Sequence, residues 1–322
     1  MKTQWCLSLA LVLIPSGQAA RTAAPGTINY IEGQVSVDGS AMATQQDGNT
    51  VLRNDQVISV GNGKAEVLLS PGTFLRVGNN SQVRMISATL ADPRMEVVRG
   101  EAMVEVDYKP KMARLDIMER GSDVELLKEG LYKFDADEAN VEVIDGKAAV
   151  TDNGQSKEIG KGKELVLTGA ALTPVKFDRK AEDDLYRWSD VRASYVAQAN
   201  AASAQTVYAG GGWGMGYGPG WLWNPYFATY SWLPGDGFFW SPFGYPFYSP
   251  GYIRYAPAIR GYYGGWRTLT TAGRGTFAGG IGRARAGAVP SAGFRSMAAG
   301  PRFSGGAAHF SGGGAMRGGG RR

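Results

Sequence analysis

The chain has 322 residues, of which 43% are hydrophobic and 20% are charged, and its formal net charge is +5. It holds one cysteine, Cys6, and one histidine, His309, which excludes disulfides, Cys/His zinc sites and His-dependent triads from the chain between them. Residues 21–198 carry 22 basic and 28 acidic side chains, whereas residues 199–322 carry 11 arginines and one acid. An acidic half is therefore joined to a basic half that is rich in glycine and aromatic residues.

The first twenty residues have the features of a secretory signal peptide. Lys2 precedes an apolar run over residues 7–14, and Pro15 is followed by small residues up to Ala20. A basic start, a short apolar core and small residues define such a signal. The run is far shorter than the ~20 residues that span a bilayer. We expect cleavage next to Ala19 and an exported bacterial protein, periplasmic or at the cell surface, without a membrane span.

Residues 21–177 form short β-type segments separated by turn residues. Residues 34–37 and 56–60 alternate apolar and polar side chains, and Asp38-Gly39, Gly61-Asn62-Gly63 and Asp145-Gly146 follow such segments. Period-2 alternation between turns predicts half-buried strands in hairpins. We expect an all-β domain, an antiparallel sandwich or β-roll of short strands, in which residues 61–63 are a turn.

A composite motif runs through residues 27–106. It begins with the segment 30–37, continues through Asp55 and the segments 56–69 and 71–81, and ends at Val97-Val98-Arg99-Gly100-Glu101. This order of strands and turns resembles the FecR-type domain of bacterial envelope proteins, with Asn54 where that family usually has glycine.

The resemblance implies a non-enzymatic envelope domain that binds a partner or is bound by one. Members of the family often serve as periplasmic sensors that relay an iron-transport signal to a cytoplasmic sigma factor through a transmembrane helix. The cleavable signal of this chain differs from that arrangement, so the resemblance leaves the relay role open.

The acidic segment at Asp135 and Asp137 is the strongest candidate for chemistry in the folded half. Paired carboxylates can perform acid/base catalysis or bind Ca²⁺. The segment lacks the regular series of Asp/Asn ligands and the distal Glu of a calcium loop, so a solvated acidic turn is the favoured interpretation. We identify no catalytic constellation, no cofactor site and no metal site.

Residues 178–205 change to a helical period. Apolar side chains recur every three or four residues, and acids occupy the first turns, which suits the helix dipole. The recurring residues are Leu185, Trp188, Val191, Tyr195 and Ala199. We expect an amphipathic helix that packs on the β domain with Trp188 as its anchor, or one that docks a partner.

Residues 206–266 are rich in glycine, proline and aromatic residues, with 21 aromatics between Tyr208 and Trp266. Two arrangements are open: the rings fold back on the β domain, or they form a surface that binds a glycan or another copy of the chain. The residues predicted to take part in interaction are Trp188, Trp221, Trp223, Tyr226, Trp240, Phe243, Tyr245, Tyr248 and Tyr252.

Residues 267–322 consist mainly of glycine, alanine and arginine, a composition typical of disorder. Arginine and glycine with aromatics also resemble RNA-binding arms, but the signal peptide argues against nucleic acid. Attachment to anionic envelope polymers, or to the acidic half of the chain, and a passive tail are the remaining interpretations.

The sequence thus predicts an exported, non-enzymatic FecR-like envelope protein that engages a protein or a cell-wall polysaccharide, with self-association possible. One alternative is a periplasmic signal-transduction regulator of the FecR sensor type. Another is a carbohydrate-active enzyme that uses Asp135 and Asp137.

Overall fold

The computed structural model describes residues 23–43, 48–167, 172–178, 182–211 and 220–256. The predicted signal peptide, residues 1–20, and the predicted tail, residues 267–322, lie outside the described residues. The chain divides into two compact units, Met1–Ala272 and Gly273–Arg322, and the second contains no described residue.

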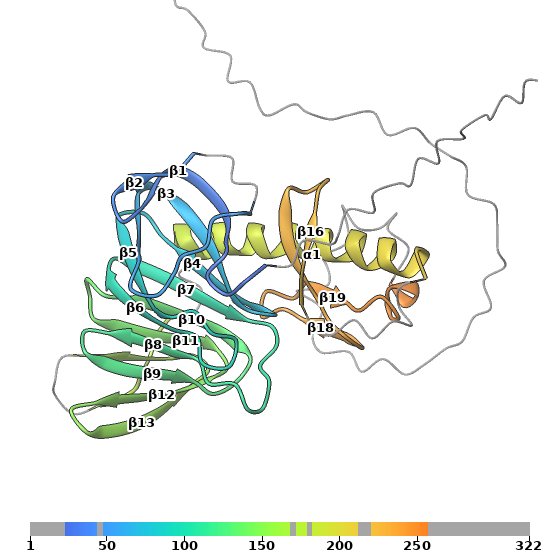
Figure 1. The fold of residues 1–322 in the computed structure, drawn as a ribbon. Helices are drawn as coiled ribbons and strands as arrows, with labels where there is room; N and C mark the ends of the chain where they lie inside the picture. The colour runs from blue at the N-terminus through green and yellow to red at the C-terminus, as the bar shows by residue number, and fades with distance from the viewer. Residues whose placement is uncertain (1–22, 44–47, 168–171, 179–181, 212–219, 257–322) are drawn as a thin grey trace, which may run out of the picture. The chain divides into compact units, whose positions relative to one another are not determined.

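Most of the described chain forms one large sheet that curls on itself, which we call the β roll (Figure 1). The expected all-β fold is confirmed. The strands run in the order β13-β12-β9-β8-β6-β5-β3-β4-β7-β10-β11-β14-β15, with β1 on β3 and β2 on β1. Neighbours pair antiparallel, except that β6 and β8 pair in parallel.

The strands are β1 (Ile28–Val37), β2 (Ser40–Ala41), β3 (Val57–Ser70), β4 (Thr73–Val77), β5 (Ser81–Ser87), β6 (Arg94–Arg99), β7 (Glu101–Val106), β8 (Asp116–Glu119), β9 (Ser122–Leu126), β10 (Gly130–Asp135), β11 (Asn140–Asp145), β12 (Lys147–Asp152), β13 (Gln155–Gly160), β14 (Lys163–Val166) and β15 (Val175–Lys176).

The core of the β roll follows from the alternation in the sequence. Inward positions along successive strands are β-branched or other apolar residues that are fully buried, among them Val67, Val104 and Val143. Because successive side chains of a strand point to opposite faces, each apolar alternate residue reaches the same interior. This burial supplies the main stabilisation of the roll.

The segment Gly61-Asn62-Gly63 is not the predicted turn. It lies inside β3, which continues for 14 residues. At this point Gly33 of β1 faces Gly63, and a Cβ on either residue would lie about 2.1–2.2 Å from a backbone oxygen of the other strand. The glycines are required for the close approach of two long strands, and they do not reverse the chain.

Helix α1 (Asp184–Ala209) follows the β roll. The carboxylate of Asp183 caps it by accepting a hydrogen bond from the backbone N–H of Tyr186 at 2.6 Å. No helix in the described part of the chain is long and apolar enough to cross a membrane.

The predicted apolar stripe of this helix is wrong in part. Val191 and Tyr195 are 66% and 37% exposed, whereas the polar Arg192 and Asn200 are buried. Small residues fill most of the remaining buried face, which allows close packing of other elements. The polar side chains lie inside because they hydrogen-bond there, as shown below.

After α1 the chain forms short hairpins that we call the aromatic layer, residues 220–256. The first pairs β16 (Gly220–Asn224) with β17 (Thr229–Leu233), and the second pairs β18 (Phe238–Trp240) with β19 (Pro246–Tyr248). A short 3₁₀ helix, η2 (Ile253–Tyr255), ends the described residues. Both hairpins lie beside α1 (Figure 1). Of the two open arrangements, the described rings adopt mainly the one that folds back.

Candidate functional site: the aromatic layer and the charge network beneath it

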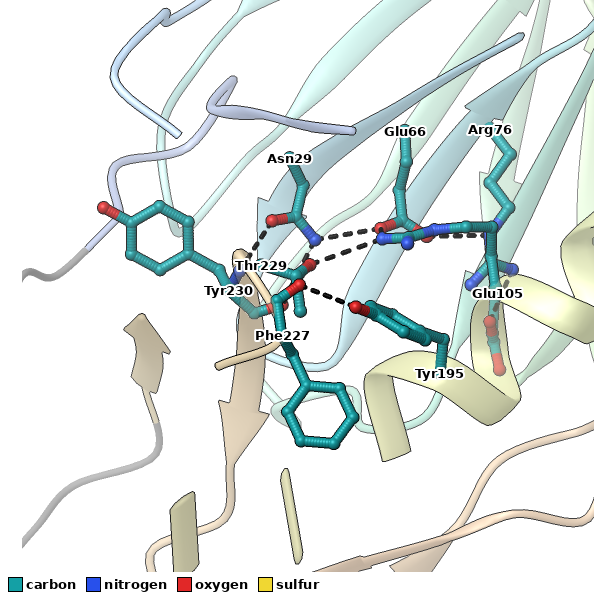
Figure 2. Close-up of polar contacts among 9 residues, drawn as sticks. Asn29, Glu66, Arg76, Glu105, Tyr195, Phe227, Thr229 and Tyr230 are labelled. Carbon is teal, nitrogen blue, oxygen red and sulfur yellow. Dashed lines mark hydrogen bonds and ion pairs between the residues drawn. The ribbon is translucent and has the colours of Figure 1, made fainter. Parts of the chain in front are cut away.

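A buried carboxylate joins the β roll, helix α1 and the aromatic layer (Figure 2). Glu66 of β3 is fully buried and pairs with Arg76 of β4 at 3.0 Å and with Arg192 of α1 at 2.8 Å. Arg192 also donates a hydrogen bond to the hydroxyl of Thr229 in β17, at 3.3 Å. Burial alone would raise the pKa of Glu66, but the charges and hydrogen bonds of Arg192 and Arg76 outweigh it and lower the pKa to about 2.

Arg76 extends the network to two further buried acids, Glu105 and Asp107. Arg76 reaches the carboxylate of Glu105 in β7 at 2.5 Å, and neither side chain is exposed to solvent. Asp107, two residues further, is 3% exposed, and its carboxyl group forms a side-chain hydrogen bond with Glu105. Burial and repulsion from Glu105 raise the pKa of Asp107 well above its usual range. Two buried arginines thus face three buried acids, so a proton on Asp107 makes the cluster neutral.

Asparagine side chains fix the backbone of the aromatic layer. Asn29 of β1 accepts from the N–H of Tyr230 at 2.7 Å and donates to its carbonyl at 3.1 Å, a contact that spans 201 residues of sequence. Asn200 of α1 does the same for Tyr248 at 2.7 and 3.1 Å, and also donates to the carbonyl of Trp232. These bonds satisfy strand groups that would otherwise be buried without partners.

The inward rings of the layer form an apolar cluster on the β roll. Trp232 and Phe247 are fully buried and lie 5.6 Å apart between ring centroids. Tyr108 of the roll stacks on Trp232 at 5.6 Å and 18°, and Phe74 of β4 meets Trp221 edge-on at 5.0 Å. Such ring pairs add to the stabilisation from burial, so the layer is packed on the roll.

The nine predicted interaction residues divide into three groups. Trp221, Phe243 and Tyr248 are buried, so in this conformation their rings cannot contact a partner. Trp188, Trp223 and Tyr245 are half-buried. The exposed members are Tyr226, Trp240 and Tyr252, at 93%, 55% and 39%.

Two exposed rings lie together on β18. Phe238 and Trp240 are 49% and 55% exposed, and their centroids are 6.1 Å apart. Phe239, between them, points to the other face and contacts Trp232 at 5.0 Å. The period of two along a strand therefore places one ring inside and two rings outside.

Sequence reasoning missed Phe238 and Tyr255, which is 66% exposed. Successive rings of the run Phe238-Phe239-Trp240 point to opposite faces of the strand. The sequence predicts these faces only if the segment is already known to be a strand. The reasoning also missed the network of Glu66, Arg76 and Arg192. Its only sequence signal was the presence of charged residues in otherwise apolar segments.

Asp135 and Asp137 form a turn. One carboxylate oxygen of Asp135 accepts hydrogen bonds from the backbone N–H groups of Asp137 and Glu138 at 3.0 and 3.1 Å. This is a side-chain cap of the β10–β11 connection. Among the described residues, no three His, Cys, Asp or Glu side chains lie close enough together to hold a metal ion.

Comparison with known proteins identifies the β roll. Residues 56–157 match the family model described as FecR protein. This match agrees with the sequence resemblance to the FecR-type domain. The matched range runs from the start of β3 into β13, so it extends beyond the resemblance at residue 106 and leaves out β1 and β2.

Two crystal structures of a protein described as a "putative anti-sigma factor", from Parabacteroides distasonis, are distantly similar. Each is 20% identical over 38% of this chain and 61% of the other, with a TM-score of 0.34. The chain spans about three fifths of the length of that protein. No curated protein matches the sequence.

Proposed function

We propose that the protein is an exported, non-enzymatic envelope protein that binds a protein or a cell-wall polysaccharide through the outward rings of the aromatic layer. The observation that carries this proposal is the pair Phe238 and Trp240, two half-exposed rings that lie 6.1 Å apart on the outward face of one strand. Tryptophan and other large rings dominate binding energy when they are presented on a rigid surface. The FecR-type domain serves here as the rigid base, because the Glu66 network ties the layer to it.

Cosedimentation of the purified protein with isolated cell envelopes tests this proposal. Replacing both Phe238 and Trp240 with alanine should reduce the bound fraction at least tenfold, since the two rings are the proposed contact. Met112→Ala is the matched control, because Met112 is a 95% exposed apolar residue of the β7–β8 connection, outside residues 220–256 of the layer. Equal binding by the double variant and the wild type would reject the outward rings as the contact.

A second candidate function is signal transduction of the FecR sensor type, and the family match over residues 56–157 favours it. In this case the outward rings would bind a partner that carries the signal onward. Transcript profiles of a host that carries the double variant at Phe238 and Trp240 would distinguish the two functions. A coherent set of changed genes supports signalling, and an unchanged profile with lost envelope binding supports attachment alone.

A further inference from the structure

A row of polar side chains crosses four strands on the outward face of the β roll. Ser36 of β1 lies opposite Ser59 of β3, and Ser59 lies opposite Gln82 of β5. Gln82 in turn lies opposite Arg99 of β6. Neighbouring strands are about 4.8 Å apart, so this polar row is about 14 Å long. The residues next to it along the strands are buried valines and isoleucine, namely Val35, Ile58, Val60 and Val83.

The polar row lies in a cavity of about 620 Å³, which is within the usual size of small-molecule sites. Gly33 and Gly61 also line this cavity. A Cβ at Gly61 would come within 3.0 Å of the side-chain oxygen of Gln34, so the glycine keeps the hollow open. The hollow is lined mainly by strand residues, together with Met42 after β2 and Asn80 in the turn before β5.

The polar row has unused hydrogen-bonding capacity. None of its four side chains makes a hydrogen bond or an ion pair with another residue of the described ranges, 23–43, 48–167, 172–178, 182–211 and 220–256. By contrast, the outward Arg84 of β5 is paired with Glu96 of β6. Among the described residues no acidic side chain lines the cavity, and Arg99 is the one charged side chain that these residues contribute to it. Such a site favours an anionic ligand.

The position of the row restricts the kind of ligand. At the polar row, β3 and β5 have partner strands on both sides, and β2 covers β1 at Ser36 and Val37, so a peptide cannot add a strand within the row. Val35 and Val60 are 4% exposed and offer no apolar pocket for a side chain. The polar row presents two hydroxyls, one amide and one guanidinium, and Gln34 and Asn80 add two amides to the cavity lining. These groups complement sugar hydroxyls and a carboxylate.

We propose that the polar row is a binding site for an acidic saccharide. The sugar hydroxyls bond with Ser36, Ser59 and Gln82, and the sugar carboxylate pairs with Arg99. This site is distinct from the outward rings Phe238 and Trp240, and it does not depend on the function proposed for them.

Titration calorimetry of the full chain with trigalacturonate at low salt tests the site. Saturable binding is expected, with an affinity at least tenfold higher than for neutral galactotriose. Arg99→Ala should weaken binding at least tenfold, and Gln82→Ala should weaken it several-fold. Arg53→Ala is the matched control, because Arg53 is an exposed arginine outside the cavity.

Several results would overturn the proposal: no saturable binding of trigalacturonate, equal binding of the neutral sugar, or unchanged binding by Arg99→Ala. An Arg99-dependent preference for a short polyglutamate peptide over the saccharide would also reject the assigned ligand class. The double variant at Phe238 and Trp240 should bind trigalacturonate like the wild type. Loss of binding in that variant would contradict the independence of the two surfaces.

Discussion

The β roll and the aromatic layer belong to one compact unit, yet different interactions hold them in place. The roll buries a continuous core of alternating apolar residues from thirteen of its fifteen strands. The layer has strands of three to five residues, which are too short for independent hairpins to be stable in water. It depends instead on rings packed against the roll and on polar side chains of β1 and α1. A region of unusual composition can therefore be ordered when another region supplies its partners.

The strongest test of this comparison removes the carboxylate shared by both regions. Glu66→Ala should lower the free energy of unfolding by about 3–5 kcal/mol, because it leaves Arg192 buried without its acid and Arg76 with Glu105 alone. Denaturant unfolding measures this loss. Glu96→Ala is the control, since its pair with Arg84 is partly exposed and should contribute only about 0–1 kcal/mol. Similar losses in both variants would contradict a central role for the Glu66 network.

A smaller change should affect the aromatic layer alone. Asn200→Ala removes the bonds to the backbone of Trp232 and Tyr248 and should cost about 1–3 kcal/mol. Hydrogen exchange should show loss of protection at the Tyr248 amide, with the strands of the roll unchanged. Gln198→Ala, which removes a bond within the helix to Ser194, serves as control. Equal loss of protection in the roll would show that the two regions unfold together.

Two buried acids whose pKa values shift in opposite directions should contribute to the pH dependence of stability, beside Glu119, whose burial raises its pKa to about 8. The pKa of Asp107 is raised, so its contribution to stability is full below the unfolded pKa of about 3.9 and is lost as the pH rises through the folded value. The pKa of Glu66 is lowered to about 2, so its contribution is full above about 4.3 and is lost as the pH falls toward 2. Asp107 faces Glu105, Arg76 and Glu66.

Denaturant midpoints measured from pH 4 to pH 8 test this assignment. Asp107→Asn cannot ionise, so it should remove the part of the decline in stability that accompanies rising pH. An identical pH profile in the variant and the wild type would show that Asp107 is not the titrating group.

The smallest effect on stability is expected at the outward rings. Phe238→Ala should change the free energy of unfolding by no more than ~0.5 kcal/mol, because the ring is half-exposed. Phe239→Ala, one residue further, should cause a clearly larger loss, since its ring contacts Trp232 and Tyr108. Thermal unfolding of the two variants compares the faces of β18. Equal losses would mean that the layer is not ordered as a two-faced strand.

The sequence predicted the β roll because its strands follow a local rule. Alternation and turn residues were enough to indicate strands such as residues 34–37, and the FecR-type motif was recognisable from the same segments. The turn at residues 61–63 was wrong because glycine serves both for chain reversal and for close approach of strands. Only knowledge of the facing Gly33 distinguishes the two uses.

The aromatic layer could not be predicted in the same way, because its partners are distant in sequence. The buried face of α1 contains Arg192 and Asn200, which an apolar period does not reveal. Their partners, Glu66 and Tyr248, lie on other elements. The composition of residues 206–266 indicated many rings, but not which of them face inward. Burial here is decided by the tertiary contacts.

The bond between Asn29 and Tyr230 also has a consequence for the order of assembly. These residues are 201 positions apart, so the side chain of Asn29 in β1 can form its two bonds to Tyr230 only after most of the chain has been synthesised. Until then Leu68 and Phe74, which the layer covers, remain open to solvent. A nascent chain that ends before β16 therefore exposes these apolar side chains. A delay in producing the last hairpins should favour aggregation during biogenesis.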